Sequence, residues 1–248
     1  MDRMPEQPPT PAPAEPAAQM SIAQSLAVVG RVFYAPRSVY EAIRGGLPFW
    51  PALVLLALLY LAAFLFYSPY MAEAFHAMIQ TGDVQLPMQG LQDLSQEEFI
   101  AKTRLPVALT FFLMSLAALI AGAFFYWLAL TVTFGGASFR RVFNLKVHVS
   151  FIELLFTLLM LVYLRIVQPE FASIQELAGS FDLSPALLMG EATGFAVRLL
   201  RHLNVFAIWQ LAVFIGGIAF LLDRKWSKVF WPIILIFLLG IALQSISG

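Results

Sequence analysis

Residues 105–139, LPVALTFFLMSLAALIAGAFFYWLALTVTFGGASF, form the longest uncharged segment of the chain. A helix that crosses a bilayer needs about 20 consecutive apolar residues. This segment therefore predicts a transmembrane span, whose membrane part we place at residues 107–134. Other apolar segments predict further spans at residues 49–67, 147–165, 203–222 and 229–246. The expected fold class is all-α, a polytopic membrane protein with five transmembrane helices.

The composition agrees with a membrane protein and argues against several function classes. Hydrophobic residues make up 60% of the chain and charged residues 12%, whereas soluble domains average about 45–50% and about 25%. A formal net charge of zero, without any Lys/Arg-rich block, argues against a nucleic-acid partner. Because cysteine is absent, the chain has no disulfide framework, thiol nucleophile or thiolate metal site.

The segment before the first span divides into a tail and two short helices. Residues 1–19 are rich in Pro and Ala and have few bulky apolar side chains, so we expect a disordered tail. Within residues 20–44, apolar residues recur at helical spacing, and Pro36 suits the first turn of a second helix that a glycine pair ends. We expect these amphipathic helices to lie at the membrane interface, with packing against cytosolic loops as the alternative. Together with the spans they form one membrane domain, residues 20–248.

Lys and Arg residues orient the predicted spans. The N-terminal segment and the connections between spans two and three and between spans four and five carry ten of them, against five in the longer connections on the other side. Because short basic connections remain in the cytosol, we expect a cytosolic N-terminus and a C-terminus outside. The predicted cytosolic basic surface comprises Arg140, Arg141, Lys146, Arg224, Lys225 and Lys228.

The two longer connections, residues 68–105 and 168–202, are predicted to contain short helices. Ser95 and Glu98 have the spacing of a capping box, in which each side chain accepts a hydrogen bond from the other residue's backbone N–H. Pro185 suits the first turn of another helix. We therefore expect helices to start near residues 95 and 185.

Glu153 is the most informative polar residue, because an acid within a span costs about 2.5–3.5 kcal/mol and usually faces a protein interior or a cavity. Counting about 1.5 Å per residue places it near the depth of Gly216, Gly217 and Tyr126. We expect the glycines to admit a close helix approach around a buried Glu153. Tyr126, or a basic residue of the neighbouring connection, would then bind the acid. The functional interpretation is a protonatable or cation-binding site, and the structural one is a shallow acid paired with the basic connection.

The remaining polar residues of the spans suggest no catalytic chemistry. Gln210 and Gln244 are predicted at similar depths, which favours an interhelical amide pair, with a polar pocket as the alternative. His148 is predicted near the inner boundary while His76 and His202 lie on the other side, so no three-histidine metal site is expected. Because no paired acids or positioned nucleophile is visible, we predict no catalytic residue, no cofactor and no metal site.

Three stretches carry a resemblance to a known family. They are GRVFYAPRSVYEAIRGGLPFWPAL at residues 30–53, WLALTVTFGGASFRRVFNLKVHVSFIELL at residues 127–155 and LNVFAIWQLAVFIGGIAFLLDRKWSKV at residues 203–229. In this order the chain resembles the Yip1-domain family over about residues 20–248, although the family pattern often has a proline early in the third span and this chain has Glu153 nearby instead. The resemblance implies a compact helical membrane module without an established catalytic site. Eukaryotic relatives act in traffic between endoplasmic reticulum and Golgi and associate with Rab-type GTPases, a partner that would not extend to a bacterial protein.

These observations predict a non-enzymatic membrane module. It would act as a scaffold, as a partner-binding or membrane-organising protein, or as an accessory subunit of a larger membrane complex. The alternative is a small oligomeric channel or transporter that uses Glu153 and the intramembrane glutamines. The expected partners are membrane lipids and a membrane protein or a second copy of the chain. Short connections favour the bacterial cytoplasmic (inner) membrane, with the endoplasmic reticulum or Golgi membrane as the alternative.

Overall fold

A computed structural model describes residues 21–81, 94–169, 171, 174–189 and 194–247, so the predicted tail at residues 1–19 lies outside the described part. Every regular element in the described part is a helix. The long helices are α3 (Trp50–Gln80), α4 (Gln96–Phe134), α5 (Phe139–Val167), α8 (Val205–Leu221) and α9 (Trp226–Ser247). The short ones are α1 (Ile22–Arg31), α2 (Pro36–Arg44), α6 (Ile174–Gly179), the 3-10 helix η1 (Pro185–Met189) and α7 (Phe195–Arg201). The predicted all-α fold class is confirmed.

The expected membrane spans correspond to four long helices and one bent pair. Helices α3, α4, α5 and α9 are each long and apolar enough to cross a membrane. Helix α8 has 17 residues and is therefore only about 25 Å long, shorter than a hydrocarbon core of about 30 Å. It forms a fifth candidate span only together with α7, which meets it at a bend of 64°.

Two spans extend further than their apolar sequences predict. Helix α3 continues past residue 67 to Gln80, and α4 begins at Gln96 rather than near residue 107. The reason is a separate small core, in which Ala72 and Ile79 of α3 are buried together with Phe99 of α4. This packing stabilises the helices beyond the length that a membrane requires.

The predicted capping box at the start of α4 is confirmed. The Ser95 N–H donates to Glu98 Oε2 at 3.2 Å, and the Glu98 N–H donates to Ser95 Oγ at 3.4 Å. The second predicted helix start differs in type, because Pro185 opens a 3-10 helix rather than an α-helix. Ser184 caps it by accepting a hydrogen bond from the Ala186 N–H at 3.1 Å.

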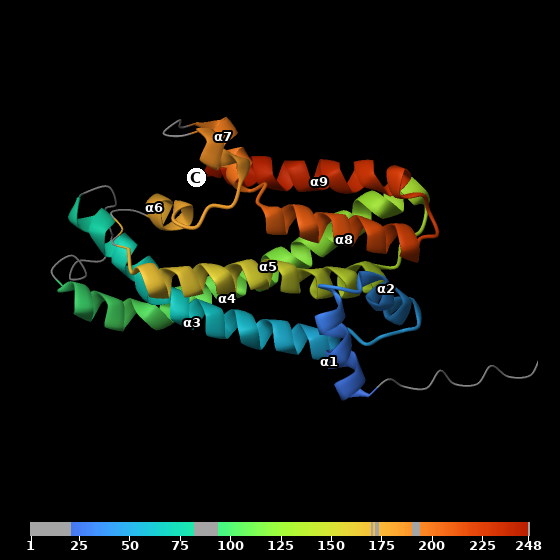
Figure 1. Cartoon of the computed structure of the whole chain (residues 1–248), viewed down its shortest axis with the longest axis horizontal. Helices are drawn as coiled ribbons and strands as arrows, with labels where there is room; N and C mark the ends of the chain where they lie inside the picture. The colour runs from blue at the N-terminus through green and yellow to red at the C-terminus, as the bar shows by residue number, and fades with distance from the viewer. Residues whose placement is uncertain (1–20, 82–93, 170, 172–173, 190–193, 248) are drawn as a thin grey trace, which may run out of the picture.

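The bundle is elongated and its two ends differ (Figure 1). One end carries α1, α2 and the turns that join α4 to α5 and α8 to α9. We call it the basic end, because its two turns carry the exposed cations Arg140, Arg141, Arg224, Lys225 and Lys228, in addition to exposed arginines of α1 and α2. The opposite end, called the distal end, carries α6, η1 and α7. Between the ends, α4, α9, α8 and α5 contact one another in a ring, and α3 packs against α4 and α5.

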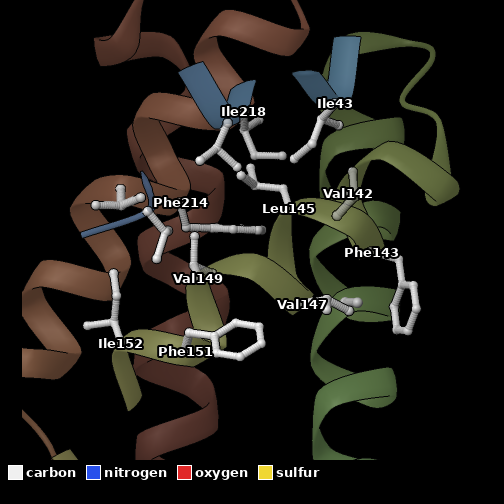
Figure 2. Close-up of a cluster of buried hydrophobic side chains, with 14 of the residues drawn as sticks. Ile43, Val142, Phe143, Leu145, Val147, Val149, Phe151, Ile152, Phe214 and Ile218 are labelled. Carbon is white, nitrogen blue, oxygen red and sulfur yellow. The ribbon is translucent and has the colours of Figure 1, made fainter. Parts of the chain in front are cut away.

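Helix α2 is anchored in the core of the basic end. The Tyr40 hydroxyl donates to the Val213 carbonyl oxygen of α8 at 2.7 Å. Burial raises the pKa of Tyr40 to about 12, so the hydroxyl keeps its proton and remains a donor at neutral pH. Figure 2 shows Ile43 of α2 beside Leu145 of α5 and Ile218 of α8 in the same buried cluster. The N-terminal helices thus pack on the bundle, and their contact with the membrane interface stays a prediction.

An arginine fastens the C-terminal end of α2. Arg44 donates to the backbone carbonyl oxygen of Phe220 and to Asp223 Oδ1, the latter at 2.8 Å. Its guanidinium also lies 4.0 Å from the centre of the Phe220 ring. Together with the Tyr40 hydrogen bond, these contacts attach both turns of α2 to α8.

Three helices lie in close contact at Gly217. A Cβ atom on Gly217 would lie 2.6 Å from Leu145 Cδ2 and 2.9 Å from Tyr40 Cε1. Neither neighbour is free to move, because Leu145 is fully buried and Tyr40 is held by its hydrogen bond. The predicted close helix approach therefore exists, and its partners are α2 and α5.

We expect Gly217→Ala to lower the free energy of unfolding by about 1–3 kcal/mol, the usual cost of overpacking a core. Gly240 of α9 is the matched control, because a Cβ atom there meets nothing within 4 Å. Gly240→Ala should be neutral or slightly stabilising, since Ala favours a helix over Gly. Denaturation of both variants in detergent measures the difference, and equal stability would contradict the close contact at Gly217.

Candidate functional site

A cavity of about 970 Å³ lies among α3, α4, α5, α8 and α9 and extends to the distal end. We call it the interhelical cavity. Most of its wall is apolar, and each of the five helices contributes at least one aromatic ring: Phe64, Phe111, Phe156, Phe206, Phe214 and Phe237. Spaces of this size and character hold small molecules in other proteins.

Four polar residues of α5 line the interhelical cavity: Lys146, Ser150, Glu153 and Thr157. We call them the polar stripe. Their spacings of four, three and four residues place them on one face of the helix, along about 16 Å of its axis. The sequence suggested Lys146 as one possible basic partner of Glu153, but it did not reveal the stripe. The signal that could have revealed it is this regular spacing of polar residues within an apolar span.

Glu153 faces the cavity instead of being buried beside the glycine pair as predicted. Its side chain is exposed, and Gln210 Nε2 of α8 donates to Glu153 Oε2 at 3.3 Å. The same amide lies 3.4 Å from the Val149 carbonyl oxygen. Gly216 and Gly217 instead adjoin Tyr40. The depth estimate failed because Glu153 lies level with Gln210, whereas Gly217 lies level with Leu145, about two turns away along α5.

Tyr126 lies close to Glu153 without binding it. Both residues line the interhelical cavity, as does Tyr60 of α3. The hydrogen bonds among the described residues include none between Tyr126 and Glu153, so this part of the prediction is wrong. The Tyr126 ring packs on Phe214 instead, with 4.8 Å between the ring centres.

Lys146 differs from the other predicted surface cations. Helix α5 begins at Phe139, so Lys146 lies almost two turns inside the helix, and its side chain is part of the cavity wall. Its Cε atom lies near Gly122 of α4. It attracts Glu153 electrostatically, but the ion pairs of the described residues include neither of them. The other five predicted cations are exposed at the basic end.

The distal end of the cavity carries a second polar group that sequence reasoning did not identify: Asp182, Arg198, Arg201, His202 and Asn204. We call it the distal mouth. Arg201 Nε and Asp182 Oδ2 lie 4.0 Å apart. The Asn204 side chain caps α8 by accepting a hydrogen bond from the Ala207 N–H at 2.9 Å. The bend between α7 and α8 brings these residues together, and no local sequence pattern indicates that bend.

The other intramembrane candidates are separate from the cavity or cannot be placed. His148 is buried, and its Nδ1 lies 2.9 Å from the Asn144 carbonyl oxygen, on the turn where Asn144 Nδ2 donates to the Leu47 carbonyl oxygen. This arrangement ties α5 to the segment that precedes α3. The Gln244 side chain lies outside the described part, and Gln210 pairs with Glu153. Across the described residues, no group of three His, Asp or Glu side chains is arranged to hold a metal ion.

Comparisons with known proteins agree with this architecture. A family model described as the Yip1 domain matches residues 30–246, which is most of the chain. The chain belongs to the Yip1-domain family. It is an integral membrane protein with several apolar helices, as the resemblance implied. No curated protein and no solved structure matches this Yip1 domain.

The geometry of this Yip1 domain defines what the cavity can hold. An apolar wall receives hydrocarbon, while the polar stripe and the distal mouth offer both signs of charge and an amide. A polar group inside a membrane protein is stabilised when it has polar partners or water there. The cavity therefore suits a molecule with a polar part and an apolar part.

We expect the polar stripe to be reachable by water-soluble reagents. Because the chain lacks cysteine, single cysteines can be introduced without background. Thr157 lines the cavity, whereas its neighbour on α5, Leu158, is exposed outside it. Thr157→Cys and Leu158→Cys are therefore a matched pair. Only the thiolate reacts with a charged methanethiosulfonate, and a thiolate forms in polar surroundings. The cysteine at position 157 should therefore react at least about tenfold faster than the cysteine at position 158. The measurement is the labelling rate in liposomes, and equal rates would mean that the stripe is not a polar environment.

Proposed function

We propose that this Yip1 domain is a non-enzymatic, membrane-organising module that binds one membrane amphiphile in the interhelical cavity. The observation that carries the proposal is the polar stripe along the middle of a cavity wall that is mostly apolar. The bilayer supplies molecules that match both parts of this wall. A lipid would place its headgroup along the stripe and its chains against the aromatic wall.

The cost of the polar stripe supports a binding role. A charge at the centre of a span costs about 2.5–3.5 kcal/mol on insertion. Glu153 lies midway along α5, and Lys146 lies about two turns from its start. An ion pair between them would reduce that cost, yet no such contact forms among the described residues. Side chains that only stabilise a bundle are expected to satisfy one another. Ser150 and Thr157 donate to backbone carbonyl oxygens of α5. Lys146, by contrast, forms no ion pair among the described residues, and Glu153, which accepts a hydrogen bond from Gln210, still faces a space large enough for a ligand.

The channel or transporter predicted as the alternative receives partial support. Its residues Glu153 and Gln210 do meet in one cavity. At the basic end, however, Leu145, Phe214 and Ile218 form a closely packed buried layer (Figure 2). A route through a single chain would have to open this layer. We therefore favour binding over conduction.

The exposed cations of the basic end support a proposal for location and orientation. The short turns that carry Arg140, Arg141, Arg224, Lys225 and Lys228 favour a cytosolic placement. Anionic lipids attract such residues with about 1 kcal/mol each. We propose the cytoplasmic membrane of a bacterium, with the basic end on the inner face. A scaffold or accessory-subunit role would use the lipid-exposed surface of α4 instead of the cavity.

The test fills the cavity without disturbing the core. Ala118 of α4 is exposed and lines the cavity, whereas the neighbouring Ala117 is exposed and does not. We expect the protein purified in mild detergent to retain about one lipid per chain. We expect Ala118→Trp to abolish this retention because the indole occupies the cavity, and Ala117→Trp to preserve it. Native mass spectrometry counts the lipids that remain bound.

Two results would decide against the proposal. Loss of lipid in both variants, or in neither, would mean that the cavity is not the binding site. A stoichiometric membrane-protein partner that remains bound to both variants, without lipid, would favour the scaffold function. Melting temperatures of the two variants show whether either substitution has damaged the fold.

A further inference from the structure

We propose that the interhelical cavity selects an amphiphile whose headgroup carries both a phosphate and an amine, as in an aminophospholipid. The phosphate would lie toward Lys146 and the amine at Glu153. This inference rests on the function proposed above and adds the chemical class of the ligand. It is argued from the position of the two charges, from the surroundings of Glu153 and from the balance of charge in the cavity.

The two charges face the same space at different levels. Seven residues separate Lys146 from Glu153, which places them on one face of α5 with about 10.5 Å between their Cα atoms along the axis. The Lys146 side chain extends beside Gly122 of α4. The charges attract one another, but they form no ion pair among the described residues. The space between them is therefore positive at one end and negative at the other.

A headgroup with the opposite polarity fits this space. In phosphoethanolamine, two carbon atoms separate the phosphate oxygen from the ammonium group, so both charges can be met at once. A purely anionic headgroup would be attracted by Lys146 and repelled by Glu153. An amine without phosphate would leave Lys146 unpaired, and an uncompensated charge in a desolvated site is costly. Only a headgroup with both charges places a phosphate near Lys146 and an ammonium group near Glu153.

The surroundings of Glu153 suit an ammonium group. Gln210 donates to Oε2 of the carboxylate and fixes its orientation. Tyr60 and Tyr126 line the same cavity as Glu153. Aromatic faces attract ammonium groups, most strongly where water is excluded. A carboxylate beside aromatic rings is thus a site for a cationic amine.

The distal mouth offers a competing position for an anionic headgroup. Arg201 lies near Asp182, while Arg198 lines the cavity. Arginine binds phosphate well, so the mouth alone would favour acidic lipids over zwitterionic ones. The two positions predict opposite headgroup preferences, which makes the assignment testable.

The experiment compares lipids with identical dioleoyl chains on the full-length, delipidated protein. Native mass spectrometry titrations give the affinities for phosphatidylethanolamine, phosphatidylglycerol and diacylglycerol. We expect phosphatidylethanolamine to bind the native chain about tenfold more tightly than phosphatidylglycerol, the effect of one charge-assisted contact. Diacylglycerol should bind most weakly.

Substitutions in the stripe then separate its two poles. Glu153→Gln should lower the affinity for phosphatidylethanolamine about tenfold, because the amine loses its partner. The affinity for phosphatidylglycerol should stay the same or rise. Lys146→Met should lower the affinity for both phospholipids, because both carry the phosphate. Arg165→Gln, which removes an exposed cation on the same helix outside both the cavity and the basic end, is the control and should change neither affinity. Glu153→Asp retains the charge and should keep the preference for the amine, even where the melting temperature falls.

The outcomes distinguish this inference from the proposed function. Equal affinities for the two phospholipids, a preference for phosphatidylglycerol, or an unchanged preference in Glu153→Gln would overturn the headgroup assignment. The proposed function would stand in each case, provided that Ala118→Trp still abolishes binding. If no lipid binds, or if Ala118→Trp leaves binding intact, the proposed function itself fails.

Discussion

The close contact of α2, α5 and α8 around Gly217 determines how the rest of the structure is arranged. The absence of a side chain at this position lets Leu145 and the Tyr40 ring reach the backbone of α8. Tyr40 then bonds to Val213. Three segments that are distant in the sequence are thereby locked at one end of the bundle. The contact also fixes the rotation of α5, because Leu145 can occupy the core only in one orientation of the helix.

The rotation of α5 in turn directs the polar stripe. Buried residues such as Leu145 and Ile152 hold one side of the helix in the core. Lys146 and Glu153 each follow one of them directly in the sequence, about 100° further around the helix, and therefore face the cavity. The favourable free energy of core packing thus offsets the unfavourable free energy of placing two charges within a span. This coupling explains how a chain with so few charged residues can keep a polar wall inside a largely apolar bundle.

Hydrophobic run lengths and cap signals predicted the fold class, because helices in a membrane must satisfy their backbone hydrogen bonds internally. The capping box at Ser95 was predicted correctly in detail, since it depends only on local spacing. The site was predicted less well. Its depth was counted from an assumed start of the span at residue 147, whereas α5 starts at Phe139, a shift of about 12 Å. Lys146 consequently appeared to belong to a surface turn, and Glu153 was assigned the wrong neighbours.

The distal mouth could not be predicted from the sequence. Its residues come together through the bend between α7 and α8, which no local sequence pattern indicates. Helix α8 is too short to cross a hydrocarbon core alone and forms a candidate span only together with α7. The polar residues of the turn between α7 and α8 line the cavity. One requirement relates the short helix α8, its capped turn and the polar stripe: polar groups within a bilayer need polar partners. A polar group inside a bilayer needs a continuous set of polar partners, and α5 and α8 provide it from opposite sides.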